Sequence, residues 1–222
     1  LFRDIISICS SLHFAKLPKH KKKIENLGID KENIFITGSL SNDNFNFFKS
    51  QPKKNVKDII GKKIKLKFAM VSFHPVTKPF HVFDNDIDEL LNTLEKFKNI
   101  HFIFTSSNQD PMGILFNKKI KEFVFKNSSH TEFIPNLGLI NYFTMLSSAS
   151  FMIGNSSSGV IESALFKIPS IIIRPRQDGR AKNENVIECL NRRDEIKLSI
   201  NKALSNEFIK KAKKTKNIYR LF

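Results

Sequence analysis

The chain of 222 residues lacks several signatures that would identify its class directly. No apolar run approaches the roughly 18 residues of a membrane-spanning helix, so no membrane partner is expected. Cysteine is scarce, and the two cysteines, Cys9 and Cys189, stand far apart with neither in a CxxC motif. Neither a zinc site nor a redox pair is therefore indicated, and a reduced, cytoplasmic setting is expected. Internal repeats and coiled-coil patterns are also absent.

Negative charge is in short supply, because 37 Lys and Arg residues face 21 Asp and Glu residues and leave a formal net charge of +16. One interpretation of such a chain is nucleic-acid binding. The other is a solvated basic surface, because the lysines are scattered and mostly flank apolar positions at helical or strand spacing. No recognised nucleic-acid-binding module accompanies them. We favour the second interpretation, with a positive field that attracts an anionic substrate.

Strand and helix patterns alternate along the chain. Strands are expected at residues 12–15, 33–37, 66–73, 100–105, 131–134, 151–153 and, last, 170–174. Helices are expected at residues 18–27, from a cap at Asp84 or Asn85 to 97, and at 117–125, 139–147, 159–166, 194–204 and 205–216. The Asn- and Lys-rich residues 41–57 are expected to form a linker or hinge. This rhythm predicts an α/β fold with a Rossmann-like, doubly wound parallel sheet, which binds ligands at the carboxyl ends of its strands.

The strongest chemical feature is the run GNSSSG at residues 154–159, between an expected strand and an expected helix. Glycines let the backbone approach an anion, and free N–H groups and serine hydroxyls donate hydrogen bonds to it. Glu162 falls in the first turn, where a carboxylate can accept two hydrogen bonds from a ribose diol. The alternative is a capped helix whose Glu complements the helix dipole. The first interpretation predicts a site for a nucleotide diphosphate.

Residues 154–162, GNSSSGVIE, resemble the nucleotide loop of UDP-N-acetylglucosamine 2-epimerases. Other segments resemble the hydrolysing branch of that family in the same order: Gly38-Ser39 followed by Asp43, FHPVT at 73–77, NQDPMG at 108–113, and RQDGR at 176–180 followed by NENV at 183–186. Non-hydrolysing members carry a different sequence at the HPVT position. The hydrolysing branch makes N-acetylmannosamine for sialic acid synthesis, and close relatives act on bacillosamine nucleotides.

The resemblance implies a two-domain, glycosyltransferase-B-like fold with the substrate in the cleft between the domains. Residues 1–45 would be the tail of the N-terminal domain and the hinge, and residues 46–205 the UDP-binding Rossmann-like domain. Residues 206–222 would form a C-terminal helix that packs back across the hinge. The chain begins at Leu1, with residues that read as part of a folded unit, so we expect a piece of a longer protein.

The resemblance also implies roles for individual residues. Ser157 and Ser158, with the adjoining backbone N–H groups, would hold the diphosphate, and Glu162 would hold the ribose. Arg180 would pair with an anion near the phosphates or lock the loop, whereas Arg176 is equally well explained by a salt bridge within its loop. The positions that would bind UDP are Asn108, Asn136, Leu137, Ser156, Ser157, Ser158, Gly159, Glu162 and Arg180.

Three of these positions lie on other loops at the same expected edge of the sheet. Asn108 would line the cleft, and Asn136 and Leu137 would flank the uracil through backbone atoms. His74 follows a buried strand and is the candidate catalytic residue, because a histidine there can contact the leaving diphosphate and neutralise developing charge. The alternative is a loop histidine that only positions the backbone before Pro75.

The chemistry that the resemblance implies is removal of the proton at C2 of the sugar while UDP leaves from C1, followed by addition of water to the glycal. It requires no metal and no nicotinamide cofactor. The acid–base carboxylates of the family lie in the N-terminal domain, so the chain alone should bind a UDP-sugar without turning it over. The alternatives are a glycosyltransferase of the same fold and, with less support, a basic nucleic-acid-binding domain. A homo-oligomer is left open.

Overall fold

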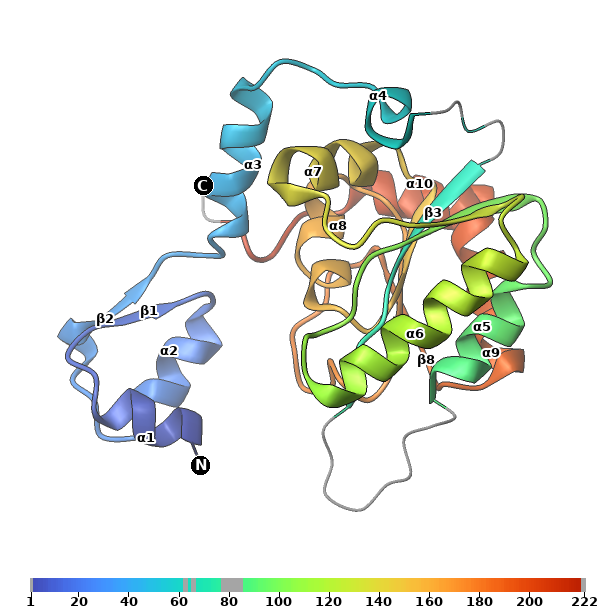
Figure 1. The fold of residues 1–222 in the computed structure, drawn as a ribbon. Helices are drawn as coiled ribbons and strands as arrows, with labels where there is room; N and C mark the ends of the chain where they lie inside the picture. The colour runs from blue at the N-terminus through green and yellow to red at the C-terminus, as the bar shows by residue number, and fades with distance from the viewer. Residues whose placement is uncertain (1, 62–63, 65–66, 77–85, 221–222) are drawn as a thin grey trace.

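A six-stranded parallel sheet forms the centre of the computed structural model, which describes residues 2–61, 64, 67–76 and 86–220 (Figure 1). The strand order is β5-β4-β3-β6-β7-β8, so the direction of winding reverses between β3 and β6. The strands are β3 (Lys67–Ser72), β4 (Ile100–Phe104), β5 (Thr131–Phe133), β6 (Phe151–Gly154), β7 (Ser170–Ile173) and β8 (Val186–Cys189). The prediction of a Rossmann-like, doubly wound parallel sheet is therefore confirmed.

Helices cover both faces of this sheet, because successive side chains of a strand point to opposite sides. Ala69 and Val71 of β3 belong to the core under α5, α6, α9 and α10, whereas Phe68 and Met70 belong to the core under α4 and α7. Both faces of β3 are therefore buried, as expected of a parallel strand. The helices are α4 (Val56–Ile60), α5 (Asp86–Leu94), α6 (Pro111–Lys126), α7 (Gly138–Ser148), α8 (Glu162–Leu165), α9 (Arg193–Leu204) and α10 (Asn206–Lys214).

Residues 2–36 form a small unit beside the main sheet (Figure 1). Its strands pair in parallel with each other, and Leu17 packs against Val160, Ile161, Ile172 and Tyr219 of the larger part. Its elements are α1 (Phe2–Ile8), β1 (His13–Ala15), α2 (Pro18–Glu25), the 3₁₀ turn η1 (Lys31–Asn33) and β2 (Ile34–Ile36). No helix among the described residues has both the length and the apolar character needed to cross a membrane.

The prediction of a linker at residues 41–57 is wrong, because this stretch contains the helix α3 (Ser41–Ser50) and the start of α4. The ring of Phe45 meets the edge of Phe166 with 5.1 Å between centroids, and that of Phe48 meets Phe143 at 5.7 Å. Aromatic packing of this kind stabilises a helix whose asparagines are poor helix formers. Composition indicated a linker here, and tertiary contacts overrode it.

Three other expected boundaries also differ. The strand at residues 170–174 is not the last, because β8 pairs with β7 at the edge of the sheet. Helix α6 begins at Pro111 instead of residue 117, since the Asp110 side chain caps it by accepting from Gly113 N at 2.7 Å. The helix expected at 159–166 is replaced by the 3₁₀ turn η2 (Ser157–Gly159) and the four-residue α8. The expected cap at Asp84 or Asn85 lies outside the described residues.

The C-terminal tail returns to the segment that joins β2 to α3. Helix α10 packs beside α9, and its Phe208 belongs to the main core. Beyond the helix, the carbonyl oxygen of Tyr219 accepts hydrogen bonds from Ser39 N at 3.0 Å and from Asn42 Nδ2 at 2.7 Å. The Tyr219 hydroxyl donates to the carbonyl oxygen of Ala181 at 2.6 Å. Tyr219 thus ties the start of α3 to the loop after β7.

Candidate functional site

The GNSSSG loop leaves the sheet at the point where the winding reverses. Gly154 ends β6 opposite Ser72, the last residue of β3, and has φ +144°. A Cβ at this glycine would collide with the carbonyl oxygen of Ser72. Only glycine therefore lets the two strand ends come this close, and their closeness brings the loops after β3 and β6 together.

A cleft of about 450 Å³ opens at this edge of the sheet. It is bounded by the ends of β3 and β4, the loop before α7, and the serine loop. Its lining residues are Ser72, Thr105, Pro135, Asn136, Leu137, Gly138, Leu139, Tyr142, Phe143, Ser156, Ser157, Ser158 and Glu162. Most of the positions predicted to bind UDP thus come together, although Asn136 and Leu137 lie 19 or more positions before the serine loop in the sequence. The volume lies within the range of small-molecule sites, roughly 300–1,000 Å³.

The serines of the loop have different environments. The Ser156 hydroxyl accepts from Ser158 N at 3.4 Å and caps η2. The Ser158 hydroxyl lies 2.5 Å from the hydroxyl of Tyr142, and burial raises the Tyr142 pKa more than this hydrogen bond lowers it. Within the described part of the chain, the Ser157 hydroxyl has no side-chain partner. Because α8 has only four residues, the hydroxyls and loop N–H groups must supply most of the anion-binding capacity.

Glu162 begins α8 and lines the cleft. Its Oε1 accepts a hydrogen bond from the Ser41 hydroxyl at 2.5 Å. Its Oε2 is buried and has no hydrogen-bond partner among the described residues. A buried carboxylate oxygen without a donor is unfavourable, so a ligand hydroxyl would stabilise this arrangement.

His74 lies next to the cleft and is tied to the serine loop by its backbone. Its N–H donates to Asn155 Oδ1 at 2.8 Å, and its carbonyl accepts from Asn155 Nδ2 at 2.7 Å. The ring nitrogens lie 3.4 Å from the Ser72 hydroxyl and 3.5 Å from the Ser107 hydroxyl. Burial, and then the charge of Arg176, lower the His74 pKa to about 4. The imidazole is therefore neutral at pH 7, and it can offer a hydrogen bond but not a positive charge.

The loop after β7 packs against the same asparagine. Gln177 is buried, and its Nε2 donates to the carbonyl oxygen of Asn155 at 2.7 Å. Arg176 also donates to that oxygen, from Nη1 at 3.2 Å, and this contact differs from the salt bridge within its loop that was one of its two interpretations. Asn155 thus joins the loops after β3, β6 and β7.

The remaining predicted positions lie outside the cleft lining. Arg180 is exposed on the loop after β7, and the Tyr219 hydroxyl holds the neighbouring residue Ala181. Asn108 is exposed, with its backbone packed against Gly113. Gly159 is buried against Ser170 and Ile172.

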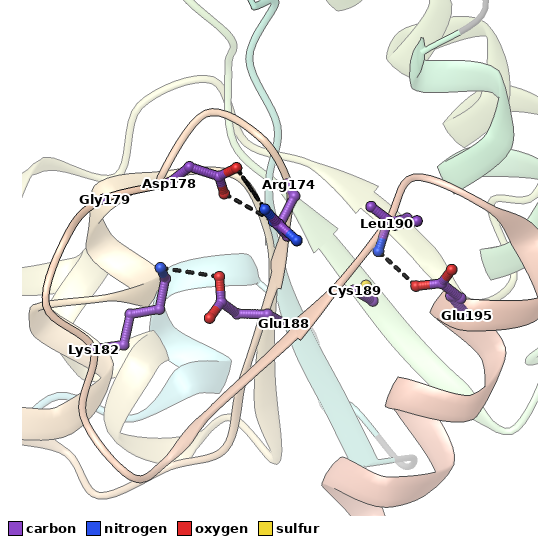
Figure 2. Close-up of a pocket in the computed structure, with 8 residues that line it drawn as sticks. All are labelled: Arg174, Asp178, Gly179, Lys182, Glu188, Cys189, Leu190 and Glu195. Carbon is purple, nitrogen blue, oxygen red and sulfur yellow. Dashed lines mark hydrogen bonds and ion pairs between the residues drawn. The ribbon is translucent and has the colours of Figure 1, made fainter.

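A second hollow, of about 370 Å³, lies at the outer edge of the sheet near β7 and β8 (Figure 2). Its charged groups face one another: Arg174 pairs with Asp178 at 2.9 Å, and Lys182 pairs with Glu188 at 2.9 Å. Glu195 Oε2 accepts from the backbone N–H of Leu190 at 2.8 Å. None of the predicted UDP-binding positions lines it, so the candidate site is the cleft at the reversal point.

The family model described as UDP-N-acetylglucosamine 2-epimerase matches residues 1–221. The chain belongs to the UDP-N-acetylglucosamine 2-epimerase family.

Curated relatives of the chain include a hydrolysing 2-epimerase and a protein of polysialic acid biosynthesis. A GDP/UDP-N,N'-diacetylbacillosamine 2-epimerase (hydrolyzing) from Campylobacter jejuni is 35% identical over 84% of this chain and 48% of the relative. Polysialic acid biosynthesis protein P7 from Escherichia coli is 31% identical over 98% of this chain and 55% of the relative. The resemblance seen in the sequence is confirmed, and the chain spans about half the length of the curated relatives it matches.

Solved 2-epimerase structures share the fold. The UDP-N-acetylglucosamine 2-epimerase of Neisseria meningitidis, bound to UDP-GlcNAc, superposes with a TM-score of 0.75 at 14% identity, over 96% of this chain and 59% of that one. A Staphylococcus aureus MnaA structure with UDP gives a TM-score of 0.71 at 16% identity, over 98% of this chain and 58% of that one. The glycosyltransferase-B-like architecture implied by the resemblance is confirmed by these neighbours.

The sequence did not predict several residues that shape the candidate site. Asn155 and Gln177 stood inside the matched motifs, and only their burial shows that they join the loops. Tyr142 carried no motif, although its position one helical turn beyond the 135–137 loop could have suggested it. Ser41 carried no local signal, because its partner Glu162 is 121 positions away.

Proposed function

We propose that this chain is the nucleotide-binding part of a hydrolysing UDP-N-acetylglucosamine, or related UDP-sugar, 2-epimerase. Such an enzyme releases UDP and a free 2-epimerised N-acetyl sugar for sialic-acid-type sugar biosynthesis. The observation that carries the proposal is the cleft at the reversal point, lined by the serine loop and by Glu162, whose Oε2 is buried without a hydrogen-bond partner among the described residues. A donor-rich loop suits a diphosphate, and a carboxylate suits a ribose diol.

The proposed placement of UDP follows from what each wall offers. The hydroxyls of residues 156–158 and the N–H groups of their turn would bind the diphosphate. By resemblance, Arg180, which is exposed on the loop after β7, would be a further partner of the anion. Glu162 would accept from the ribose hydroxyls. The backbone at Asn136 and Leu137, on the opposite wall, would flank the uracil. A solved structure of the same fold with UDP bound supports UDP as the ligand.

The proposed chemical role of the chain is to stabilise the leaving group. As the bond from C1 to the diphosphate breaks, negative charge grows on the departing oxygen, and hydrogen bonds aimed at that charge lower the barrier. His74, held neutral beside the cleft, would contribute a hydrogen bond to that oxygen. By resemblance, the groups that move the C2 proton belong to the other domain of the whole enzyme, and no metal or redox cofactor takes part.

The proposed division of the chain follows the resemblance. Residues 1–45 belong to the N-terminal domain and hinge, residues 46–205 to the UDP-binding domain, and residues 206–222 to the segment that returns to the hinge. The names of the relatives cover N-acetylglucosamine and N,N'-diacetylbacillosamine, and both UDP-sugars are candidate substrates. The cytoplasmic location stays a prediction.

Calorimetry with UDP tests the proposal on the 222-residue chain. UDP is expected to bind, and Glu162→Ala is expected to weaken binding by at least about tenfold, since hydrogen bonds to a charged group are worth roughly 1.5–3 kcal/mol. Glu122→Ala, on the exposed side of α6, is the matched control and should bind like the parent. UDP-N-acetylglucosamine should also bind without release of a free sugar. Absence of UDP binding by the parent, or unchanged binding by Glu162→Ala, would contradict the assignment.

A further inference from the structure

The start of α3 reaches the candidate nucleotide site through one side chain. We propose that Ser41 is a positioning residue for Glu162, so that the segment joining β2 to α3 helps to select ribose-containing ligands. This inference rests on the proposed function, because it takes Glu162 as the group that binds the ribose diol. It adds a residue from outside the UDP-binding domain to that contact.

The hydrogen bond between Ser41 and Glu162 has a defined direction. Ser41 Oγ donates to Glu162 Oε1 at 2.5 Å, and Ser39 Oγ donates to Ser41 Oγ at 3.2 Å. Ser39 is buried, with 3% of its surface exposed. Because the Ser41 oxygen already accepts from Ser39, its own proton is directed to the carboxylate. The two hydroxyls therefore hold Glu162 in one orientation.

That orientation leaves the other carboxylate oxygen for a ligand. Oε2 of Glu162 is buried without a hydrogen-bond partner in the described part of the chain, and Glu162 lines the cleft. A serine hydroxyl donates without neutralising the carboxylate, whereas Lys or Arg at this position would compete with the ligand for its charge. The carboxylate keeps its full capacity to accept hydrogen bonds at Oε2.

Ser41 can act in this way because its backbone is held on both sides. Tyr219 accepts from Ser39 N and Asn42 Nδ2, and Phe45 of α3 packs on Phe166 just beyond α8. Glu162 begins the same short helix α8, so α3 contacts both of its ends. The Ser41 hydroxyl accepts no hydrogen bond from the first backbone N–H groups of α3, so it does not cap the helix.

The test compares UDP with 2′,3′-dideoxy-UDP by calorimetry on the 222-residue chain. Ser41→Ala is expected to weaken UDP binding by about tenfold, which corresponds to roughly 1.4 kcal/mol. The same variant should change the affinity for dideoxy-UDP by less than about twofold, because that ligand has no diol to orient. Ser41→Thr keeps the hydroxyl and should restore UDP binding. Ser50→Ala, at the exposed end of α3, is the matched control and should leave both affinities unchanged.

The outcomes separate this inference from the proposed function. Equal weakening of both ligands by Ser41→Ala would show general damage to the site and overturn the positioning role. An unchanged UDP affinity in Ser41→Ala would also overturn the positioning role of Ser41. If Glu162→Ala still lost UDP affinity, the proposed function would stand without it. If the parent chain did not bind UDP, or bound both ligands equally, the ribose assignment would fail and the inference with it.

Discussion

The two hollows at the carboxyl edge of the sheet differ in how their polar groups are used. In the outer hollow near β8, carboxylates and cations pair with one another at 2.9 Å (Figure 2). In the cleft at the reversal point, the Oε2 of Glu162 and the Ser157 hydroxyl have no such partners among the described residues. A buried carboxylate oxygen without a partner is unfavourable in the empty protein, so Glu162 indicates where a ligand completes the structure.

The largest effect is expected from Gly154→Ala, which would disrupt the close contact between the ends of β3 and β6. The new Cβ would collide with the Ser72 carbonyl oxygen, and φ +144° is a conformation that alanine avoids. We expect the free energy of unfolding to fall by about 3 kcal/mol or more, with loss of UDP binding. Urea denaturation measures the first change and calorimetry the second.

Gly28→Ala provides the control for that prediction. Gly28 also has a positive φ, of +85°, but a Cβ there would meet nothing within 4 Å. Its expected cost is only the strain of the backbone, about 1 kcal/mol. Equal losses of stability in the two variants would show that the contact between the strand ends is not the cause.

A smaller effect is expected from the protonation of His74, which should make the free energy of unfolding depend on pH. The pKa is about 4 in the folded chain, against an ordinary value of 6.5. Between these values the unfolded chain binds more protons, so stability contributed by His74 is complete above pH 6.5 and falls as the pH drops towards 4. Urea unfolding from pH 4 to 8 should show a shallower fall for His74→Gln than for the parent. Identical profiles would mean that His74 is not buried as neutral imidazole.

The smallest effect is expected in the outer hollow. Lys182→Met removes the ion pair with Glu188 and keeps most of the side-chain length. An ion pair with a largely exposed partner contributes at most about 1 kcal/mol, so unfolding should shift by that amount or less. UDP affinity should stay within about twofold of the parent by calorimetry. A tenfold loss of UDP affinity in Lys182→Met would contradict the assignment of UDP to the cleft and not to the outer hollow.

Local patterns predicted five of the six strands of the main sheet and missed β8, at one of its two edges. The strands β3, β4 and β6 are apolar runs, and these runs predicted their burial. β8 was missed because its four residues, Val-Ile-Glu-Cys, directly follow a polar loop and are too few to form a clear strand pattern. Helix α3 was missed because its stability comes from aromatic rings on α7 and beyond α8.

The candidate site was predicted in the same uneven way. The serine loop and Glu162 were identified from their motif, Asn136 and Leu137 were assigned by resemblance, and the cleft brings them together. Asn108 and Arg180 were assigned by resemblance, and they stand on exposed loops outside the cleft lining. Their roles depend on how a bound ligand and the rest of the enzyme meet those loops, which the local sequence does not encode.

By itself, the sequence determined the parallel α/β class, the family, and a serine loop followed by a carboxylate, because these depend on neighbours within a few positions. Only the tertiary structure decided that Gly154 faces Ser72, that His74 is neutral, and that Ser41 holds Glu162. Each of these depends on groups more than 80 positions apart along the chain. Burial and approach between such groups are set by packing of the sheet and its helices, so they do not appear in any short stretch of sequence.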